Sequence, residues 1–262
     1  MRLVVVGGGK MGEALVGGAI RGGFAPIQEI AVVEAHEGRC GELRRSFPDL
    51  TVGQLVPECA DGVVIAVKPG DVGGACEAIL ASRPRRVLSI AAGVTIARLE
   101  GWLPGIPVVR SMPNTAALVG AGAAAIAPGS SSDDSDLAWA EEVLGSVGLV
   151  VRVAEKLLDA VTGLSGSGPA YLFVVAEALI EAGVLVGLDR ATSAALTRQT
   201  LLGAATLLID TGQPPEQLRA AVTSPAGTTA AGLRALEERG VRAAFLDAVV
   251  AATERSRELG RA

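Results

Sequence analysis

Aromatic residues are scarce in this chain. Only 3% of its 262 residues are Phe, Trp or Tyr, although 50% are hydrophobic. The core must therefore be built from Ala, Val, Leu and Ile, a composition typical of closely packed helices and buried parallel strands. The net charge is −5 and there is no basic block, so nothing predicts binding to nucleic acid or to an anionic membrane surface.

Cysteine pairs and long uncharged apolar runs are missing as well. The three cysteines are an odd number without CxxC spacing, which argues against a disulfide framework and a zinc site, so we expect no metal. The most apolar segment, 171–188, carries Glu177 and Glu181 one turn apart, as expected of a soluble helix rather than a membrane span. Because a strand opens the chain and leaves no room for a signal peptide, we expect a cytoplasmic protein.

A glycine-rich turn follows the first apolar run. Residues 2–6 (RLVVV) predict a buried strand, and Gly7, Gly9 and Gly12 then form G-x-G-x-x-G at the start of an amphipathic helix. Gly7 would permit the tight turn, Gly9 would let a pyrophosphate approach the backbone, and Gly12 would let helix and strand pack closely. The free N–H groups at the helix start would face the phosphates. The pattern predicts a dinucleotide site.

An acidic residue ends the second apolar run, EIAVVE, about twenty residues after the glycines. Glu34 can accept hydrogen bonds from the adenosine ribose and would repel a 2′-phosphate. A solvated loop residue is the alternative. Arg39, Arg44 and Arg45 follow, so a phosphate is disfavoured rather than excluded.

Further apolar runs at 61–69, 85–93 and 106–114 continue the alternation with helical segments. This alternation predicts an α/β Rossmann-type domain with a doubly wound parallel sheet over residues 1–155, closed by a last strand at 148–153.

Residues 156–262 are predicted to form an all-helical domain. Helical periodicity covers 168–187, 189–211, 214–222, 228–239 and 241–260. Such a domain would expose much apolar surface on its own, so we expect a homodimer or a higher homo-oligomer formed through it.

The stretch VTSPAGTT (222–229) lies between two of these helices. One interpretation is a structural turn, with Thr228 or Thr229 capping the next helix. The other is an anion site, in which free N–H groups near Ser224–Thr229 hold a substrate carboxylate. The residues alone do not choose between them.

These residues resemble the pyrroline-5-carboxylate reductase family. The resemblance spans the whole chain and rests on GGGKMGEAL, IAVKPGDV (65–72), VRSMPNT (109–115), TGLSGSGPAYLF (162–173) and VTSPAGTTAAGLRALEE, in the order of the family. It implies a Rossmann-type domain followed by a helical dimerisation domain. It also implies reduction of the ring imine of 1-pyrroline-5-carboxylate to L-proline with NADPH or NADH.

The resemblance assigns roles to particular residues. Ser224, Gly227 and Thr228 would offer backbone N–H groups to the substrate carboxylate, and Thr229 would hydrogen-bond the ring nitrogen as the catalytic residue. The cofactor would be bound by Gly7, Gly9, Lys10, Met11, Gly12, Glu34, Ala66, Lys68, Pro69, Ala91 and Asn114.

Three positions depart from the family pattern. Where this chain has Ala226 the family often has Gly, and with alanine there the turn requires φ values that alanine tolerates. Where this chain has Lys10 the family often has Asn or Gln, and the lysine can reach toward a phosphate. Glu34 has the largest consequence, since many members prefer NADPH and this residue favours NADH.

Groups for acid–base chemistry are few: one histidine (His36), three lysines and one tyrosine. A carbonyl reductase needs such a group, whereas a cyclic imine can enter already protonated and needs mainly orientation. The β-hydroxyacid dehydrogenases, the alternative enzyme class, carry a catalytic Lys where this chain has Leu172. A non-catalytic dinucleotide-binding paralogue would not need Ser224, Gly227, Thr228 and Thr229 intact.

Overall fold

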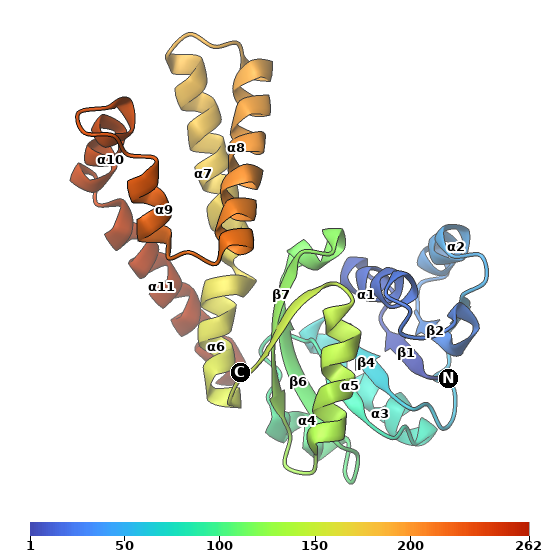
Figure 1. Cartoon of the computed structure of the whole chain (residues 1–262). Helices are drawn as coiled ribbons and strands as arrows, with labels where there is room; N and C mark the ends of the chain where they lie inside the picture. The colour runs from blue at the N-terminus through green and yellow to red at the C-terminus, as the bar shows by residue number, and fades with distance from the viewer. Residues whose placement is uncertain (262) are drawn as a thin grey trace. The chain divides into compact units, whose positions relative to one another are not determined.

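An eight-stranded sheet occupies the first half of the chain in the computed structural model, which describes residues 1–261 (Figure 1). The strand order is β3-β2-β1-β4-β5-β6-β7-β8. The strands are β1 (Leu3–Val6), β2 (Ile30–Val33), β3 (Thr51–Gly53), β4 (Val63–Ile65), β5 (Val87–Ser89), β6 (Val108–Pro113), β7 (Gly122–Pro128) and β8 (Gly148–Arg152).

The six strands from β3 to β6 are all parallel, which confirms the Rossmann-type sheet. The chain starts at β1 in the middle of the sheet, goes outward through β2 and β3, and then returns to β4 on the other side of β1. This reversal is the topological switch point, and open α/β sheets bind ligands at the carboxyl ends of the strands beside it. The fold therefore directs attention to the loops after β1 and β4.

Two strands were not predicted from the sequence. β3 has only three residues at the sheet edge, too few for a clear alternation. β7 is rich in alanine, which has a low strand propensity, and it runs antiparallel to β6 with Ser111 opposite Ile126. The predicted parallel sheet is therefore parallel-dominant, with one antiparallel pair at this end, because a short connection returns the chain beside β6 in the opposite direction.

Helices cover both faces of the sheet. They are α1 (Lys10–Arg21), α2 (Glu37–Ser46), α3 (Val72–Ser82), α4 (Ile96–Trp102) and α5 (Asp134–Gly145). Successive β1 residues point to opposite faces: Leu3 and Val5 join the core under α1 and α5, whereas Val4 and Val6 join the core under α3 and α4. This period-two burial is what a doubly wound sheet requires.

Helices dominate the chain after β8, as predicted. They are α6 (Leu158–Val161), α7 (Gly168–Leu185), α8 (Arg190–Thr211), α9 (Pro215–Ala221), α10 (Thr228–Glu238) and α11 (Val241–Arg261), with a π-helical turn at Thr162–Gly166 between α6 and α7. α7 and α8 pack closely because Gly183 lies against Ser193, whose hydroxyl donates to the Ile180 carbonyl at 2.8 Å. A side chain at Gly183 would overlap Ser193.

The chain divides into two compact units. The sheet unit comprises residues 1–167 and 250–262, and the helical unit comprises residues 168–249. The domain boundary predicted at residue 155 stays a prediction. In the division into compact units, the first turns after β8 and the end of α11 belong to the sheet unit.

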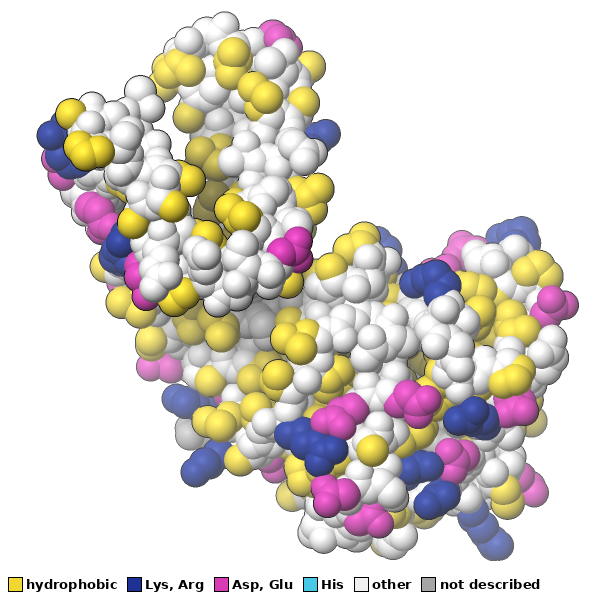
Figure 2. Space-filling model, viewed as in Figure 1, with side chains coloured by type: hydrophobic (Ala, Val, Ile, Leu, Met, Phe, Trp, Pro, Cys, Tyr) yellow, Lys and Arg dark blue, Asp and Glu magenta, His cyan; other side chains and the backbone are white. Residues whose placement is uncertain are grey.

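The helical unit has no apolar core of its own. Every buried hydrophobic side chain in the described part of the chain lies between Leu3 and Leu158, in the sheet unit. The helical unit instead exposes large apolar side chains, among them Phe173 (65% exposed) and Ile209 (77% exposed), and Figure 2 shows hydrophobic side chains over the surface of these helices.

The helical segment 155–185 is also long and apolar enough to cross a membrane by length and composition. It is the one such segment among residues 1–261, and soluble core helices pass the same test. It carries Glu177 and Glu181.

Candidate active site

The three motif glycines of the β1–α1 turn differ in what surrounds them. Gly7 has φ +107°, and a Cβ there would overlap the Ala66 carbonyl. A Cβ on Gly12 would overlap the Gly7 carbonyl oxygen. A Cβ on Gly9, by contrast, would meet nothing within 4 Å. Gly7 and Gly12 are thus required by the turn itself, whereas Gly9 borders open space where a ligand can approach the backbone.

The first turn of α1 presents unpaired backbone donors to that space. Gly9 is the N-cap and supplies no side chain to bond them. The N–H groups of Lys10, Met11 and Gly12 therefore have no partner within the helix, and the helix dipole adds partial positive charge there. Lys10 is exposed beside them. This cradle suits the pyrophosphate of a dinucleotide.

Glu34 lies against the same turn. Its Oε2 accepts a hydrogen bond from the Gly8 N–H at 2.9 Å, and its Oε1 accepts one from the His36 N–H at 2.9 Å. Arg39 donates from Nε to the Gly8 carbonyl at 2.6 Å. The sequence analysis did not predict these contacts of Gly8 and Arg39. The signals that could have pointed to them were the uninterrupted GGG and an arginine five residues after Glu34.

The other predicted cofactor residues follow β4, β5 and β6. Lys68 and Pro69 are exposed after β4, and Ala66 is half-buried. Ala91 is only 3% exposed and belongs to the core. Asn114 donates to the Ser165 carbonyl at 3.0 Å and accepts from the Ala123 N–H at 3.1 Å. Its amide thus joins β6, β7 and the π-helical turn, a structural role beside the predicted one.

A cavity of about 470 Å³ opens at this edge of the sheet unit. Its walls come from the loops after β4 and β5, at Pro69–Gly70 and Ala92–Val94, from Thr162 and Ser167, and from the end of α11. Arg98 and Arg255 contribute positive charge to its lining.

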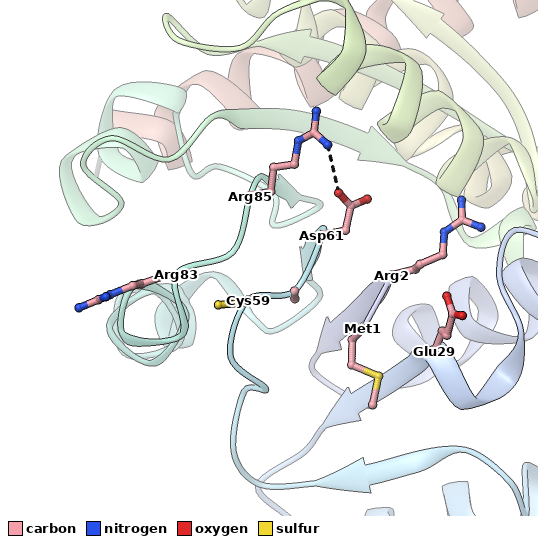
Figure 3. Close-up of a pocket in the computed structure, with 8 residues that line it drawn as sticks. Met1, Arg2, Glu29, Cys59, Asp61, Arg83 and Arg85 are labelled. Atoms are coloured by element: carbon pink, nitrogen blue, oxygen red, sulfur yellow. Dashed lines mark ion pairs between the residues drawn. The ribbon is translucent and has the colours of Figure 1, made fainter.

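A second hollow lies at the opposite edge, where β1, β4 and β5 begin (Figure 3). It is lined by Met1, Arg2, Asp61 and Arg85 among others, and the Arg85 guanidinium lies 3.6 Å from Asp61. Open α/β sheets bind ligands at the carboxyl ends of their strands, not here. None of the predicted site residues lines this hollow.

The loop before α10 contains a tight turn. The Gly227 N–H donates to the Ser224 carbonyl at 3.0 Å, and Pro225 and Ala226 occupy the corner. Ala226 has φ +56°, which is typical of the third position of a type II turn and favours glycine. The expectation that this turn asks only for φ values that alanine tolerates was wrong, since the left-handed region costs an L-residue about 1–2 kcal/mol.

The capping interpretation of this loop was also wrong. Gly227 is the N-cap of α10, and no side chain bonds the first N–H groups of the helix. Ser224 and Thr228 are exposed, whereas Gly227 and Thr229 are half-buried. A Cβ on Gly227 would overlap the Ser224 hydroxyl, which would have to rotate away from the turn. The turn therefore leaves several backbone donors open beside three hydroxyl groups, an arrangement suited to a small carboxylate.

Comparison with known proteins defines the class. Residues 2–93 match the family model "NADP oxidoreductase coenzyme F420-dependent", and residues 155–259 match "Pyrroline-5-carboxylate reductase dimerisation". A sheet with a dinucleotide-type glycine turn, joined to such a helical region, defines a nicotinamide dinucleotide-dependent oxidoreductase. No group of three or more potential metal-ligating side chains occurs among residues 1–261.

Full-length relatives narrow the class. A pyrroline-5-carboxylate reductase of Corynebacterium melassecola is 45% identical, with 99% of this chain and 98% of the relative covered. A solved pyrroline-5-carboxylate reductase of Coxiella burnetii is 37% identical with a TM-score of 0.91 and covers 98% of both chains. That of Plasmodium falciparum, solved with NADP bound, is 30% identical with a TM-score of 0.84, over 99% and 98% of the two chains. The chain belongs to the pyrroline-5-carboxylate reductase family, which confirms the resemblance.

Proposed function

We propose that this chain reduces 1-pyrroline-5-carboxylate to L-proline with a reduced nicotinamide dinucleotide. The observation that carries the proposal is the loop Ser224–Thr229, which leaves the first N–H groups of α10 uncapped in a chain that belongs to this family. A purely structural turn would gain stability from a capping side chain, and this loop forgoes one although three hydroxyl residues are at hand.

Ser224 and Thr228 bind the substrate carboxylate through backbone N–H groups in this proposal. The Gly227 N–H, which was expected to do the same, already donates to the Ser224 carbonyl within the turn. Backbone donors at a helix start are fixed by the helix and carry partial positive charge, so they hold an anion without a side-chain cation. The half-buried Thr229 contributes its hydroxyl to the ring nitrogen. The imine is thereby held at two points, which fixes the face that the ring presents.

The turn from Gly7 to Gly12 holds the pyrophosphate of the cofactor, and the loops at Ala66–Pro69, Ala91 and Asn114 border its remaining length. When bound, the reduced nicotinamide supplies the hydride for the imine carbon. The side chains of the protein need not donate a proton, because the imine enters protonated and the product is an amine. This agrees with Lys68 being the one acid–base side chain in the loops at Ala66–Pro69, Ala91 and Asn114, and with the exposed position of His36.

Glu34 makes NADH the better cofactor in this proposal. Its carboxylate is anchored beside the turn by two backbone N–H groups, so its negative charge is fixed there. The three Arg39 donor nitrogens already bond Gly8, Glu13 and Glu42. A 2′-phosphate would therefore meet a fixed anion and an arginine already engaged.

A second copy of the chain covers the helical unit, giving a homodimer or a higher homo-oligomer. The unit buries no hydrophobic side chain by itself, and its exposed apolar residues on α7 account for much of the membrane-like composition of 155–185. Size measurement by light scattering tests this, and a monomer at micromolar concentration would contradict it.

A steady-state assay tests the proposed activity. The purified protein, 1-pyrroline-5-carboxylate and either NADH or NADPH are mixed, and loss of reduced-nicotinamide absorbance is followed together with proline formation. We expect turnover with the imine. We expect no oxidation of β-hydroxy acids with the oxidised cofactor, because Leu172 stands where the β-hydroxyacid dehydrogenases have their catalytic lysine. Cofactor binding without oxidation on addition of the imine would instead identify a non-catalytic dinucleotide-binding protein.

A further inference from the structure

Side chains hold both backbone polar groups of Gly8, the central residue of GGG. The Gly8 N–H donates to Glu34 Oε2 at 2.9 Å, and the Gly8 carbonyl accepts from Arg39 Nε at 2.6 Å. A Cβ at Gly8 would also overlap Leu43 of α2. Three consecutive glycines have more conformational freedom than any other tripeptide, so a turn of this composition needs external bonds to keep one shape.

Arg39 connects this turn to two helices. Its Nη2 bonds Glu13 of α1, and its Nη1 bonds Glu42 of α2 at 2.7 Å. The side chain is only 25% exposed. The hydrogen bonds that the guanidinium donates to Glu42 and Glu13 raise the pKa of Arg39, so it stays charged. Each of its three nitrogens is thus committed to a different partner: the turn, α1 and α2.

We propose that Arg39 is a positioning residue that holds the glycine turn in the shape that receives the pyrophosphate, and that it does not read the 2′-phosphate. The inference rests on the proposed role of the turn in cofactor binding. A preformed turn avoids the loss of conformational entropy that a mobile GGG would suffer on binding. Because both cofactors share the pyrophosphate, Arg39 must support NADH and NADPH equally.

The alternative role for an arginine at this place is direct contact with a 2′-phosphate. The two roles differ in one measurable quantity, the ratio of the two cofactor dissociation constants. A phosphate contact serves NADPH alone, whereas a bond to the Gly8 carbonyl serves both cofactors. The committed donors favour the second role, since Nε and one N–H of each Nη already bond Gly8, Glu42 and Glu13, and both carboxylates oppose a phosphate beside them.

The test compares Arg39→Met with Arg44→Met by fluorescence titration of NADH and NADPH without substrate. Arg44 lies on the same helix and bonds Glu37 and the Val52 carbonyl at 2.8 and 3.0 Å, away from the turn. We expect Arg39→Met to weaken both cofactors by a similar factor, on the order of tenfold, with the KM for the imine unchanged at saturating cofactor. Arg44→Met should bind both cofactors like the wild type.

Loss of NADPH binding alone in Arg39→Met, or wild-type binding of both cofactors, would overturn the proposal. If Arg39→Met does not fold, Arg39→Lys keeps the charge but loses the forked geometry, and amide exchange at Gly8 and Gly9 becomes the readout: faster exchange supports the positioning role and unchanged exchange refutes it. A wild-type protein that binds neither dinucleotide marks failure of the proposed function itself.

Discussion

The Ser256 hydroxyl donates a hydrogen bond of 2.7 Å to Asp159 Oδ1, joining the last helix to α6 across 97 residues of sequence. Ser256 is 7% exposed, and the neighbouring Thr253 is 8% exposed. These buried polar residues, one helical turn apart near the end of α11, fix this end of the helix on the sheet unit. The end of α11 therefore belongs to the sheet unit and not to the helical unit.

Removing this bond should destabilise the sheet unit. Ser256→Ala leaves Asp159 without its partner, and we expect the free energy of unfolding to fall by about 1 kcal/mol. Urea unfolding followed by circular dichroism measures the change. Glu254→Gln, on the exposed side of the same helix turn, is the matched control and should change stability by less than about 0.5 kcal/mol. Equal stability of Ser256→Ala and wild type would show that the bond contributes nothing.

Ala226→Gly should stabilise the protein. At φ +56° an alanine is strained and a glycine is not, so we expect a gain of about 1 kcal/mol in the free energy of unfolding. The same substitution at Ala231, inside α10, should have the opposite sign and lose up to about 1 kcal/mol. Thermal unfolding of both variants gives the comparison, and a destabilised Ala226→Gly would mean that the turn geometry is different.

The cysteines should differ in reactivity. Cys59 is exposed, whereas Cys40 and Cys76 are buried and burial raises the pKa of Cys76 to about 11. At pH 8 only about 0.1% of a thiol with that pKa is thiolate, the reactive form. A chromogenic thiol reagent at pH 8 should therefore titrate one thiol per native chain and three after unfolding. Rapid reaction of a second thiol in the native protein would place Cys40 or Cys76 at the surface.

Glu34→Gln should shift cofactor preference toward NADPH. The glutamine keeps an acceptor for the Gly8 N–H but removes the negative charge that opposes a 2′-phosphate. Loss of that repulsion is worth about 1 kcal/mol, or roughly a fivefold change in the ratio of kcat/KM for NADPH over NADH. Steady-state kinetics with both cofactors provide the ratio, and an unchanged value would remove Glu34 from cofactor selection.

Much of the fold could be predicted because local pattern and tertiary environment agree. β1, α1 and β2 follow from apolar runs around fixed glycines, and α7 to α11 begin and end within a few residues of their predicted bounds. β7 was missed because its alanines carry no strand signal, and only pairing with β6 makes it a strand.

The site was predictable as a set of residues but not as a set of contacts. Nothing in the spacing of Arg39 reveals that it bonds the Gly8 carbonyl, since that contact depends on how α2 packs beside the turn. Likewise an alanine at position 226 does not predict a positive φ, because the turn between Ser224 and Gly227 imposes that conformation. The Arg39 contact depends on long-range packing, and the φ of Ala226 depends on the conformation of one four-residue turn.

Thr229→Val tests the central claim, that the loop Ser224–Thr229 holds the imine for reduction. The substitution preserves shape and removes one hydroxyl, and Thr223→Val, whose hydroxyl bonds the Arg219 carbonyl at 2.6 Å, is its control. We expect kcat/KM for the imine to fall about tenfold or more in Thr229→Val, with cofactor dissociation constants unchanged. A Thr229→Val enzyme with the kcat/KM of wild type would contradict the account.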